Sequence, residues 1–294
     1  MCGIVGLFLK NKAMAPQLGS LTAQMLTVMS DRGPDSAGFA VYGAGSAETV
    51  KLTLRIDHAA RLNEAFASRF GFPADLVQRG THVVLTIPHA LEGEARLWLT
   101  EQFPGTHLVG AGTRMELYKE VGLPGDVAAQ FDLPGMAGTH AIGHTRMATE
   151  SSVTTDGAHP FSTGIDQCLV HNGSLSNHNA MRRTLIREGM RFETENDSEV
   201  AAAYLTWRMR EGASLSGALT DCLDDLDGFY TFVVGTEGGF AVLRDPVACK
   251  PAVMAETDDY VAFGSEYRAL AMLPHVEKAR LFEPEPAKVY VWEH

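Results

Sequence analysis

The chain opens with MCGIVGLF at residues 1–8, a cysteine directly after the initiator methionine followed by a short apolar run. Removal of Met1, which a small second residue permits, leaves Cys2 with a thiol and an α-amine on one residue. The thiolate is the nucleophilic form of cysteine. An α-amine titrates at about 7.7–8.0 and a thiol at about 8.5, so the amine can accept the thiol proton near neutral pH. The stretch therefore predicts a buried strand that begins with a nucleophile and its own general base.

The composition is that of an ordinary globular protein, because 45% of the 294 residues are hydrophobic and 20% are charged. A formal net charge of −12 argues against nucleic acid and membrane as partners. No apolar run approaches the ~18 residues of a membrane span, and the N-terminus lacks the pattern of a signal peptide. The four cysteines lie far apart without a CxxC pair, which indicates no disulfide framework or zinc site and favours the reducing cytoplasm.

Apolar periodicity and turn residues divide the chain into helices and strands. The predicted strands are 4–9, 39–42, 50–56, 83–87, 107–109, one that starts at 141, 167–170, 229–235, 239–243, 251–255, 260–263 and 288–292. The predicted helices are 16–30, 92–102, 177–188, 197–210, 214–223 and 266–272. Two strand-rich blocks with helices between them indicate stacked sheets covered by helices. We expect one domain over 1–294, with a small α/β insertion at about 58–112.

The insertion carries no recognisable motif. His82, His89 and His107 lie in it without the spacing of metal ligands, so the sequence predicts no metal site. Polar residues and glycine instead gather at the ends of predicted strands elsewhere in the chain. They form four stretches: RGPDS at 32–36, GHTR at 143–146, HNG at 171–173 and NDSE at 196–199. Loops held by a rigid sheet commonly carry binding groups.

The residue types in these stretches fit a single ligand, an amino acid with a side-chain amide. Arg146 offers a planar cation for the α-carboxylate, and Asp197 offers a carboxylate for the α-ammonium. Cys2 is the candidate nucleophile for the amide carbonyl. Asn172 and Gly173 offer donors for the oxyanion of a tetrahedral intermediate.

Taken alone, the same residues also have ordinary structural interpretations. Arg146 and Asp197 could form a plain salt bridge, and Asn172-Gly173 could be a hairpin turn. Arg32 and Asp35 could brace a loop. Spacing by itself does not decide between these interpretations.

The ordered set of motifs closely resembles the class II glutamine amidotransferases. These include the glutaminase domains of amidophosphoribosyltransferase, glucosamine-6-phosphate synthase, asparagine synthetase and glutamate synthase. The resemblance rests on MCGIVG at 1–6, RGPDSAG at 32–38, GHTR at 143–146, HPF at 159–161, HNG at 171–173 and DSE at 197–199. It continues in RDP at 244–246, KP at 250–251 and SE at 265–266, and covers nearly the whole chain except the insertion.

The resemblance implies an α+β fold, the four-layer αββα sandwich of N-terminal-nucleophile hydrolases. It also implies hydrolysis of L-glutamine to glutamate and ammonia through a γ-glutamyl thioester on Cys2. The Asn172 side chain and the Gly173 N–H would form the oxyanion hole, and Arg32 would support the N-terminal loop.

The substrate-binding residues follow from the same resemblance. Arg146 would hold the α-carboxylate and Asp197 the α-ammonium of glutamine. Thr149 would lie in the loop that covers glutamine, and His159 would line the site. Met147 stands where family members commonly have an aromatic residue, so closure of this loop is expected to be looser or differently triggered.

The sequence shows no motif of a synthase domain that would use the ammonia. It resembles the detached amidotransferase subunits of glutamate-synthase-like complexes such as N-methylglutamate synthase. That resemblance implies a hetero-oligomer whose synthase subunits carry FMN and iron–sulfur clusters, with no cofactor in this chain. Two alternatives stay open: a stand-alone hydrolase of another γ-glutamyl amide, and a non-catalytic assembly subunit.

Overall fold

The computed structural model describes residues 2–56, 59–148 and 152–294. In these residues the named strands form three sheets, and their pairing is antiparallel. The large sheet has the order β15 (Arg280–Phe282), β13 (Val253–Glu256), β14 (Tyr260–Gly264), β1 (Gly3–Leu9), β8 (His140–Arg146), β2 (Ser36–Tyr42) and β7 (Met115–Val121). The second sheet has the order β16 (Val289–Glu293), β12 (Gly239–Arg244), β11 (Gly228–Gly235), β10 (Gln167–Leu175) and β9 (Phe161–Gly164). The small sheet has the order β4 (Asp75–Arg79), β5 (His82–Pro88), β3 (Thr49–Arg55) and β6 (His107–Gly112).

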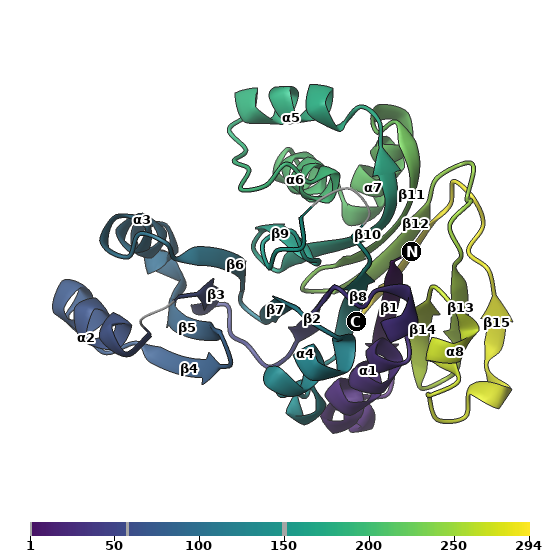
Figure 1. The fold of residues 1–294 in the computed structure, drawn as a ribbon, viewed down its shortest axis with the longest axis horizontal. Coiled ribbons are helices and arrows are strands. Elements are labelled where there is room, and N and C mark those ends of the chain that lie inside the picture. The colour runs from purple at the N-terminus through teal and green to yellow at the C-terminus, as the bar shows by residue number, and fades with distance from the viewer. Residues whose placement is uncertain (1, 57–58, 149–151) are drawn as a thin grey trace.

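Helices cover the outer face of each of the two stacked sheets (Figure 1). On the large sheet these are α1 (Leu18–Thr27), α4 (Pro124–Gln130) and α8 (Tyr267–Leu270). On the second sheet they are α5 (His178–Arg187), α6 (Asp197–Arg210) and α7 (Leu215–Asp225). Short 3-10 turns lie at Lys12–Gln17, Ser30–Arg32, His89–Leu91, Leu133–Gly135 and Val276–Lys278. The layer order is helix, sheet, sheet, helix, the αββα sandwich that the resemblance implies.

The alternation of side chains along β1 explains why this strand lies at the centre of the sandwich. Ile4 and Phe8 face the space between the two sheets, where they pack with Val170 and Val233 of the second sheet. Val5, Leu7 and Leu9 face the opposite way, into the core under α1. Successive side chains of a strand point to opposite faces, so a continuous apolar run is buried on both sides. The first strand therefore joins two hydrophobic cores.

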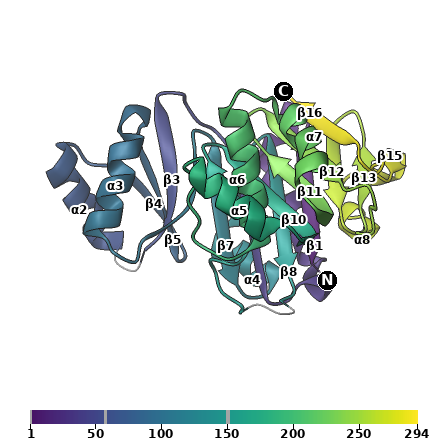
Figure 2. The same cartoon turned by 90° about the horizontal axis from the view of Figure 1, so that it is seen from above.

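The small sheet has a core of its own with α2 (Ala59–Phe70) and α3 (Glu92–Gln102) packed on it. Figure 2 shows this unit at one end of the molecule, beside β7 and the helices of the second sheet. Phe66 and Trp98 meet edge to face with ring centroids 5.8 Å apart. The predicted helix 92–102 and strands 83–87 and 107–109 are all present, while α2 and β4 are additional. The strand predicted at 50–56 pairs in this sheet as β3.

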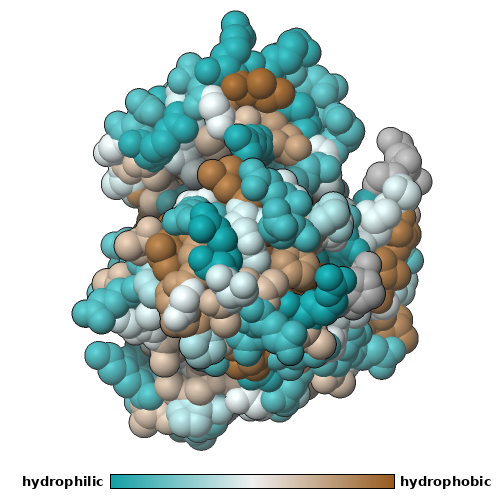
Figure 3. All heavy atoms as spheres, turned by 90° about the vertical axis from the view of Figure 1, so that its left-hand side faces the viewer, coloured by the Kyte–Doolittle hydropathy of each residue, from teal (hydrophilic) through white to brown (hydrophobic). Residues whose placement is uncertain are grey.

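The outer face of the small-sheet end is mainly hydrophilic, with hydrophobic residues in small separate groups (Figure 3). Single exposed apolar side chains such as Leu97, which is 61% exposed, are ordinary on protein surfaces. The longest helix of the described ranges is α6 with 14 residues. None of the helices in those ranges combines the length and apolar character that crossing a bilayer requires.

The predicted end of the strand at 167–170 is wrong. The sequence predicts a strand over 167–170 with the polar stretch 171–173 at its end, but β10 continues to Leu175. His171, Asn172 and Gly173 lie in the ladder opposite Phe232, Thr231 and Tyr230 of β11. Their backbone groups pair in the sheet, while the buried side chains of His171 and Asn172 hydrogen-bond with Ser198 and with the Cys2 carbonyl, so polar character does not end the strand here.

Candidate active site

Cys2 lies directly before β1, whose neighbours in the large sheet are β14 and β8. Its side chain is half-buried, and its Sγ is 3.9 Å from the carbonyl oxygen of Met147, just beyond the end of β8. Burial raises the pKa of Cys168 to about 12 and also raises the pKa of Cys222. These two thiols are therefore inert at neutral pH. Cys2 and the exposed Cys249 are the accessible thiols.

The carbonyl oxygen of Cys2 is held by two side chains from distant parts of the chain. Arg32 Nε donates to it at 3.0 Å, and Asn172 Nδ2 donates to it at 3.2 Å. Arg32 is 8% exposed and pairs through Nη1 with Glu266 Oε1 at 2.6 Å. Glu266 in turn pairs with Arg268. The peptide group of the candidate nucleophile is thus fixed while its thiol stays accessible.

Arg32 reaches this position because the turn after α1 passes close to β8. A Cβ on Gly33 would lie 2.3 Å from the carbonyl carbon of Thr145, so only glycine lets the turn pass against β8. Asp35 then locks the same strand end, because its N–H donates to the Arg146 carbonyl at 3.1 Å and its Oδ2 accepts from Ala148 N at 2.8 Å. The stretch at 32–36 positions the nucleophile and the end of β8 together.

Arg146 is the last residue of β8 and lies opposite Ser36 of β2. It is 6% exposed, and its Nη1 lies 3.4 Å from the carbonyl oxygen of Ser152. Met147 follows it with 37% of its surface exposed. Thr149 lies outside the described residues. The guanidinium is thus buried beside the segment that follows β8.

Asp197 is the first residue of α6, where the N-cap Asn196 accepts from Ser198 N at 2.9 Å. Asp197 Oδ2 accepts from Leu175 N at 2.9 Å, which ties the start of α6 to the end of β10. Its Oδ1 is 3.9 Å from His171 Nδ1. A carboxylate in the first turn is favoured by the helix dipole, and this one remains partly exposed.

Gly173 occupies a position that no other residue fits without rearrangement. Its φ is +153°, and a Cβ there would lie 2.0 Å from the carbonyl oxygen of Phe229 in β11. The neighbouring Asn172 is 3% exposed. The β10 backbone is therefore tightly packed where it carries both residues of the expected oxyanion hole.

Three buried histidines lie behind the site. The rings of His144 and His159 stack with centroids 4.1 Å apart, and His144 Nε2 is 3.2 Å from the carbonyl oxygen of His171. Burial lowers the pKa of His144 to about 3, lowers that of His171 to about 4 despite Asp197, and holds that of His159 well below its usual value. All three are neutral at pH 7. His159 is 5% exposed and lies in this cluster, next to Phe161.

The structure thus joins Cys2, Arg32 and Asn172 by direct contacts and places Met147 beside the thiol. Arg146 directly precedes Met147, whereas Asp197 contacts the strand that carries Asn172. The sequence alone indicates no role for Ser265 and Glu266, which form the SE motif at 265–266. Ser265 Oγ accepts from Ile4 N at 2.9 Å and its N–H donates to Ile4 O at 2.9 Å, and Glu266 holds Arg32.

The site offers a thiol, a buried guanidinium, a carboxylate at a helix start and a side-chain amide. Within residues 2–56, 59–148 and 152–294, no group of three or more His, Cys, Asp or Glu side chains is placed to hold a metal ion. The chemistry these residues can support is nucleophilic attack by a thiol on a carbonyl of an amino-acid ligand.

Comparison with solved structures defines the class of fold. A glutamine phosphoribosylpyrophosphate amidotransferase from B. subtilis, complexed with ADP and GMP, aligns with a TM-score of 0.64 at 20% identity. A structure described as the allosteric regulatory enzyme of purine biosynthesis aligns with a TM-score of 0.65 at 21% identity. Each alignment covers 99% of this chain and 47% of the other, so the chain spans about half the length of these enzymes. The fold is that of the N-terminal-nucleophile amidotransferases.

Comparison of sequences places the chain in a family. Residues 144–272 match the family described as "Glutamine amidotransferase domain". The chain is 60% identical over 299 residues to the "Glutamine amidotransferase-like protein GlxB" of Rhizobium meliloti (strain 1021), an alignment that covers 100% of this chain and 99% of that protein. The chain therefore belongs to the glutamine amidotransferase family, whose substrate is glutamine.

Proposed function

We propose that this chain hydrolyses L-glutamine with Cys2 as the nucleophile and delivers the ammonia to a separate synthase subunit. The observation that supports it most is the pair of hydrogen bonds from Arg32 and Asn172 to the Cys2 carbonyl. A residue held by its peptide group presents its thiol in a defined direction, and effective catalysis depends on such orientation.

The proposed reaction has two balanced steps. The α-amine of Cys2, free after removal of Met1, takes the thiol proton, and the thiolate attacks the side-chain amide carbon of glutamine. The C–N bond breaks as the leaving nitrogen takes that proton, which releases ammonia and leaves a γ-glutamyl thioester. Water then attacks the thioester, its proton returns to the sulfur through the amine, and glutamate leaves. Met1 lies outside the described residues, so its removal is part of the proposal.

The remaining residues take roles at the two ends of the substrate. The Asn172 amide and the Gly173 N–H are proposed to stabilise the oxyanion. Arg146 would bind the α-carboxylate and Asp197 the α-ammonium. Thr149 and Met147 would cover the bound glutamine, and His159 would support this wall from behind through His144.

The acceptor chemistry is proposed to lie on a partner subunit of the glutamate synthase or N-methylglutamate synthase type. The 60%-identical relative aligns with this chain over 99% of its own length and is described as an amidotransferase-like protein. In this proposal residues 1–294 act as one domain with an insertion at about 58–112, inside a cytoplasmic hetero-oligomer. FMN and iron–sulfur clusters would belong to the partner subunits.

Affinity labelling with diazo-oxo-norleucine, followed by intact mass and peptide mapping, tests the proposal. We expect a chain without Met1 that gains one adduct on Cys2 and hydrolyses glutamine. Cys2→Ala should abolish both labelling and hydrolysis, while Cys249→Ser, which removes the other accessible thiol, should leave both unchanged. Hydrolysis that survives Cys2→Ala would rule out the mechanism. Labelling that appears only after a synthase subunit is added would show that the partner gates the site.

A further inference from the structure

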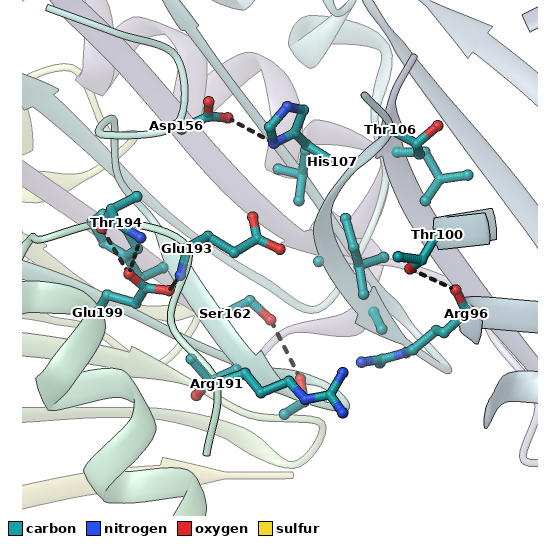
Figure 4. A pocket seen from close by; sticks show the side chains of 18 of the residues that line it. Arg96, Thr100, Thr106, His107, Asp156, Ser162, Arg191, Glu193, Thr194 and Glu199 are labelled. Carbon is teal, nitrogen blue, oxygen red and sulfur yellow. Dashed lines mark hydrogen bonds and ion pairs between the residues drawn. The ribbon is translucent and has the colours of Figure 1, made fainter. Parts of the chain in front are cut away.

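A cavity of about 420 Å³ lies between the small-sheet unit and the helices of the second sheet. One wall is formed by α3 and β6, the other by the segment 189–194 between α5 and α6, and β9 adjoins them (Figure 4). Its polar lining includes Arg96, His107, Lys119, Asp156, Arg191 and Glu193. None of these residues takes part in the active site described above. Cavities of a few hundred Å³ between structural units are common binding places for small molecules.

Two arginines from opposite walls point toward one another across this cleft (Figure 4). Arg96 comes from α3 and is paired with Glu92 of the same helix. Arg191 comes from the opposite wall, and its side chain makes no hydrogen bond or ion pair with any residue in the described ranges. Two facing guanidinium groups repel each other unless an anion lies between them, and their planar donors suit carboxylate and phosphate groups.

Most of the acidic side chains of the cleft already accept hydrogen bonds from other groups of the protein. Asp156 accepts two hydrogen bonds from Arg55 Nη2, at 2.6 and 2.8 Å. Glu199 accepts from the backbone N–H groups of Glu193 and Thr194, each at 2.8 Å. The Glu193 carboxylate has no hydrogen-bond or ion-pair partner among the described residues, and burial raises its pKa. A ligand with its acidic group at the arginines and a hydroxyl or ammonium group at Glu193 would complement both ends.

The cleft is linked to the active site by the segment that follows β8. Lys119, buried beside the cleft, donates through Nζ to the carbonyl oxygens of Asp156 and Ala158, each at 3.0 Å. Earlier in the same segment, the Ser152 carbonyl contacts Arg146. Movement of Asp156 by an occupant of the cleft would therefore be transmitted to the guanidinium proposed to bind glutamine.

We propose that this cleft is an effector site for a small organic anion, whose acidic group lies between Arg96 and Arg191, and that binding there changes the affinity for glutamine. The second half of the proposal rests on the proposed function, because it assumes that Arg146 binds glutamine. The binding site itself does not depend on that assumption.

Isothermal titration calorimetry with inorganic pyrophosphate tests the binding site. We expect binding in the millimolar range or tighter, weakened about ten-fold or more in Arg191→Ala and partly kept in Arg191→Lys, because a lone ammonium replaces the guanidinium fork. Arg183→Ala removes an exposed arginine of α5 outside the cleft and should bind like the parent. No binding by the parent protein, or equal binding by Arg191→Ala, overturns the proposal.

The coupling to the active site is measured by titrating L-glutamine into Cys2→Ala, which cannot turn it over, with and without saturating pyrophosphate. We expect the glutamine Kd to change about threefold or more, and the pyrophosphate Kd to change by the same factor with glutamine present. An unchanged glutamine Kd in a protein that binds pyrophosphate overturns the effector role. Failure of glutamine to bind at all counts against the proposed function, whereas the pyrophosphate titration still decides the anion site.

Discussion

The carbonyl oxygen of Cys2 accepts hydrogen bonds from residues 30 and 170 positions away in the chain. Both donors are nearly buried, so neither contact is weakened by full exposure to water. Arg32 is itself held by an ion pair with Glu266, so a second side chain fixes the position of this donor. At this scale the site consists of a fixed backbone and a half-exposed thiol.

Replacement of Asn172 by alanine tests its role as oxyanion donor. We expect kcat for glutamine hydrolysis to fall by about 10²–10³, because one donor to the developing charge is lost. Asn179→Ala, on the exposed surface of α5, is the matched control and should keep the parent kcat. Steady-state ammonia release measures both variants. A parent-like kcat in Asn172→Ala would remove this residue from the oxyanion hole.

Comparison of Gly173→Ala with Gly212→Ala measures how much steric crowding adds to the cost of a positive φ. The Gly173→Ala variant must adopt a positive φ and move the backbone of β11, so we expect a loss of unfolding free energy of about 3 kcal/mol or more. Gly212 also has a positive φ, +99°, but its Cβ would meet nothing within 4 Å, so Gly212→Ala should lose only about 1 kcal/mol. Urea unfolding compares the two. Equal losses would show that crowding at Gly173 is relieved without cost.

At the scale of elements, the segment between β8 and β9 connects the small sheet to the active site. Arg55, the last residue of β3, and Lys119 of β7 both hold Asp156. The other side of the segment contacts Arg146. In this arrangement the small sheet helps to position Arg146, the residue proposed to bind the α-carboxylate of glutamine.

Arg55→Ala is expected to raise the KM for glutamine about three- to tenfold with little change in kcat, because the segment beside Arg146 loses one of its anchors. Asp156→Ala should do the same, and the double variant should be no worse than either single one. Arg69→Ala breaks an exposed pair with Glu94 inside the small-sheet unit and serves as control. Glutaminase kinetics decide the point. Additive effects of the two changes would mean that the pair is not the link.

At the scale of the whole molecule, five histidines are buried in the described residues. Besides the three behind the active site, they include His82 next to Phe131 and His140 between the two sheets. Burial lowers the pKa of His82 to about 4 and that of His140 to about 3. Desolvation disfavours the charged imidazolium in each case.

These lowered pKa values predict acid sensitivity of the fold. In the unfolded chain each histidine binds a proton as the pH falls through about 6.5, while the folded protein excludes it until about 3–4. Stability is therefore full well above pH 6.5 and falls as the pH drops through this value. Each histidine contributes up to about 1.4 kcal/mol per pH unit in that window. Denaturant unfolding at pH 7.5, 6.5 and 5.5 should show a smaller loss of unfolding free energy over the first interval and a loss about three times as large, several kcal/mol, over the second. A flat profile down to pH 5.5 would show that these rings are protonated in the folded state.

Much of the element pattern follows from local sequence. The helices α3 and α6 begin and end where the periodicity predicts. The strands predicted at 229–235 and 239–243 are present as the paired β11 and β12, and those predicted at 251–255 and 260–263 as the paired β13 and β14. No element is predicted between residues 113 and 140, where the structure has β7 and α4. β7 carries Glu116, Lys119 and Glu120, and such a charged strand is recognisable only when its neighbour β2 and the buried role of Lys119 are known.

The sequence by itself determined the class of protein, because MCGIVG and the later motifs carry the nucleophile and the expected ligand-binding types in order. Tertiary structure alone decided how they act together. Antiparallel pairing of β1 with β8, and packing of β1 against β10, bring residues 2, 32, 146 and 172 into one place. Only the tertiary structure also revealed the ion pair between Arg32 and Glu266 and the cleft beside the small sheet. Contacts between residues far apart in the chain depend on packing and register, which leave no local pattern in the sequence.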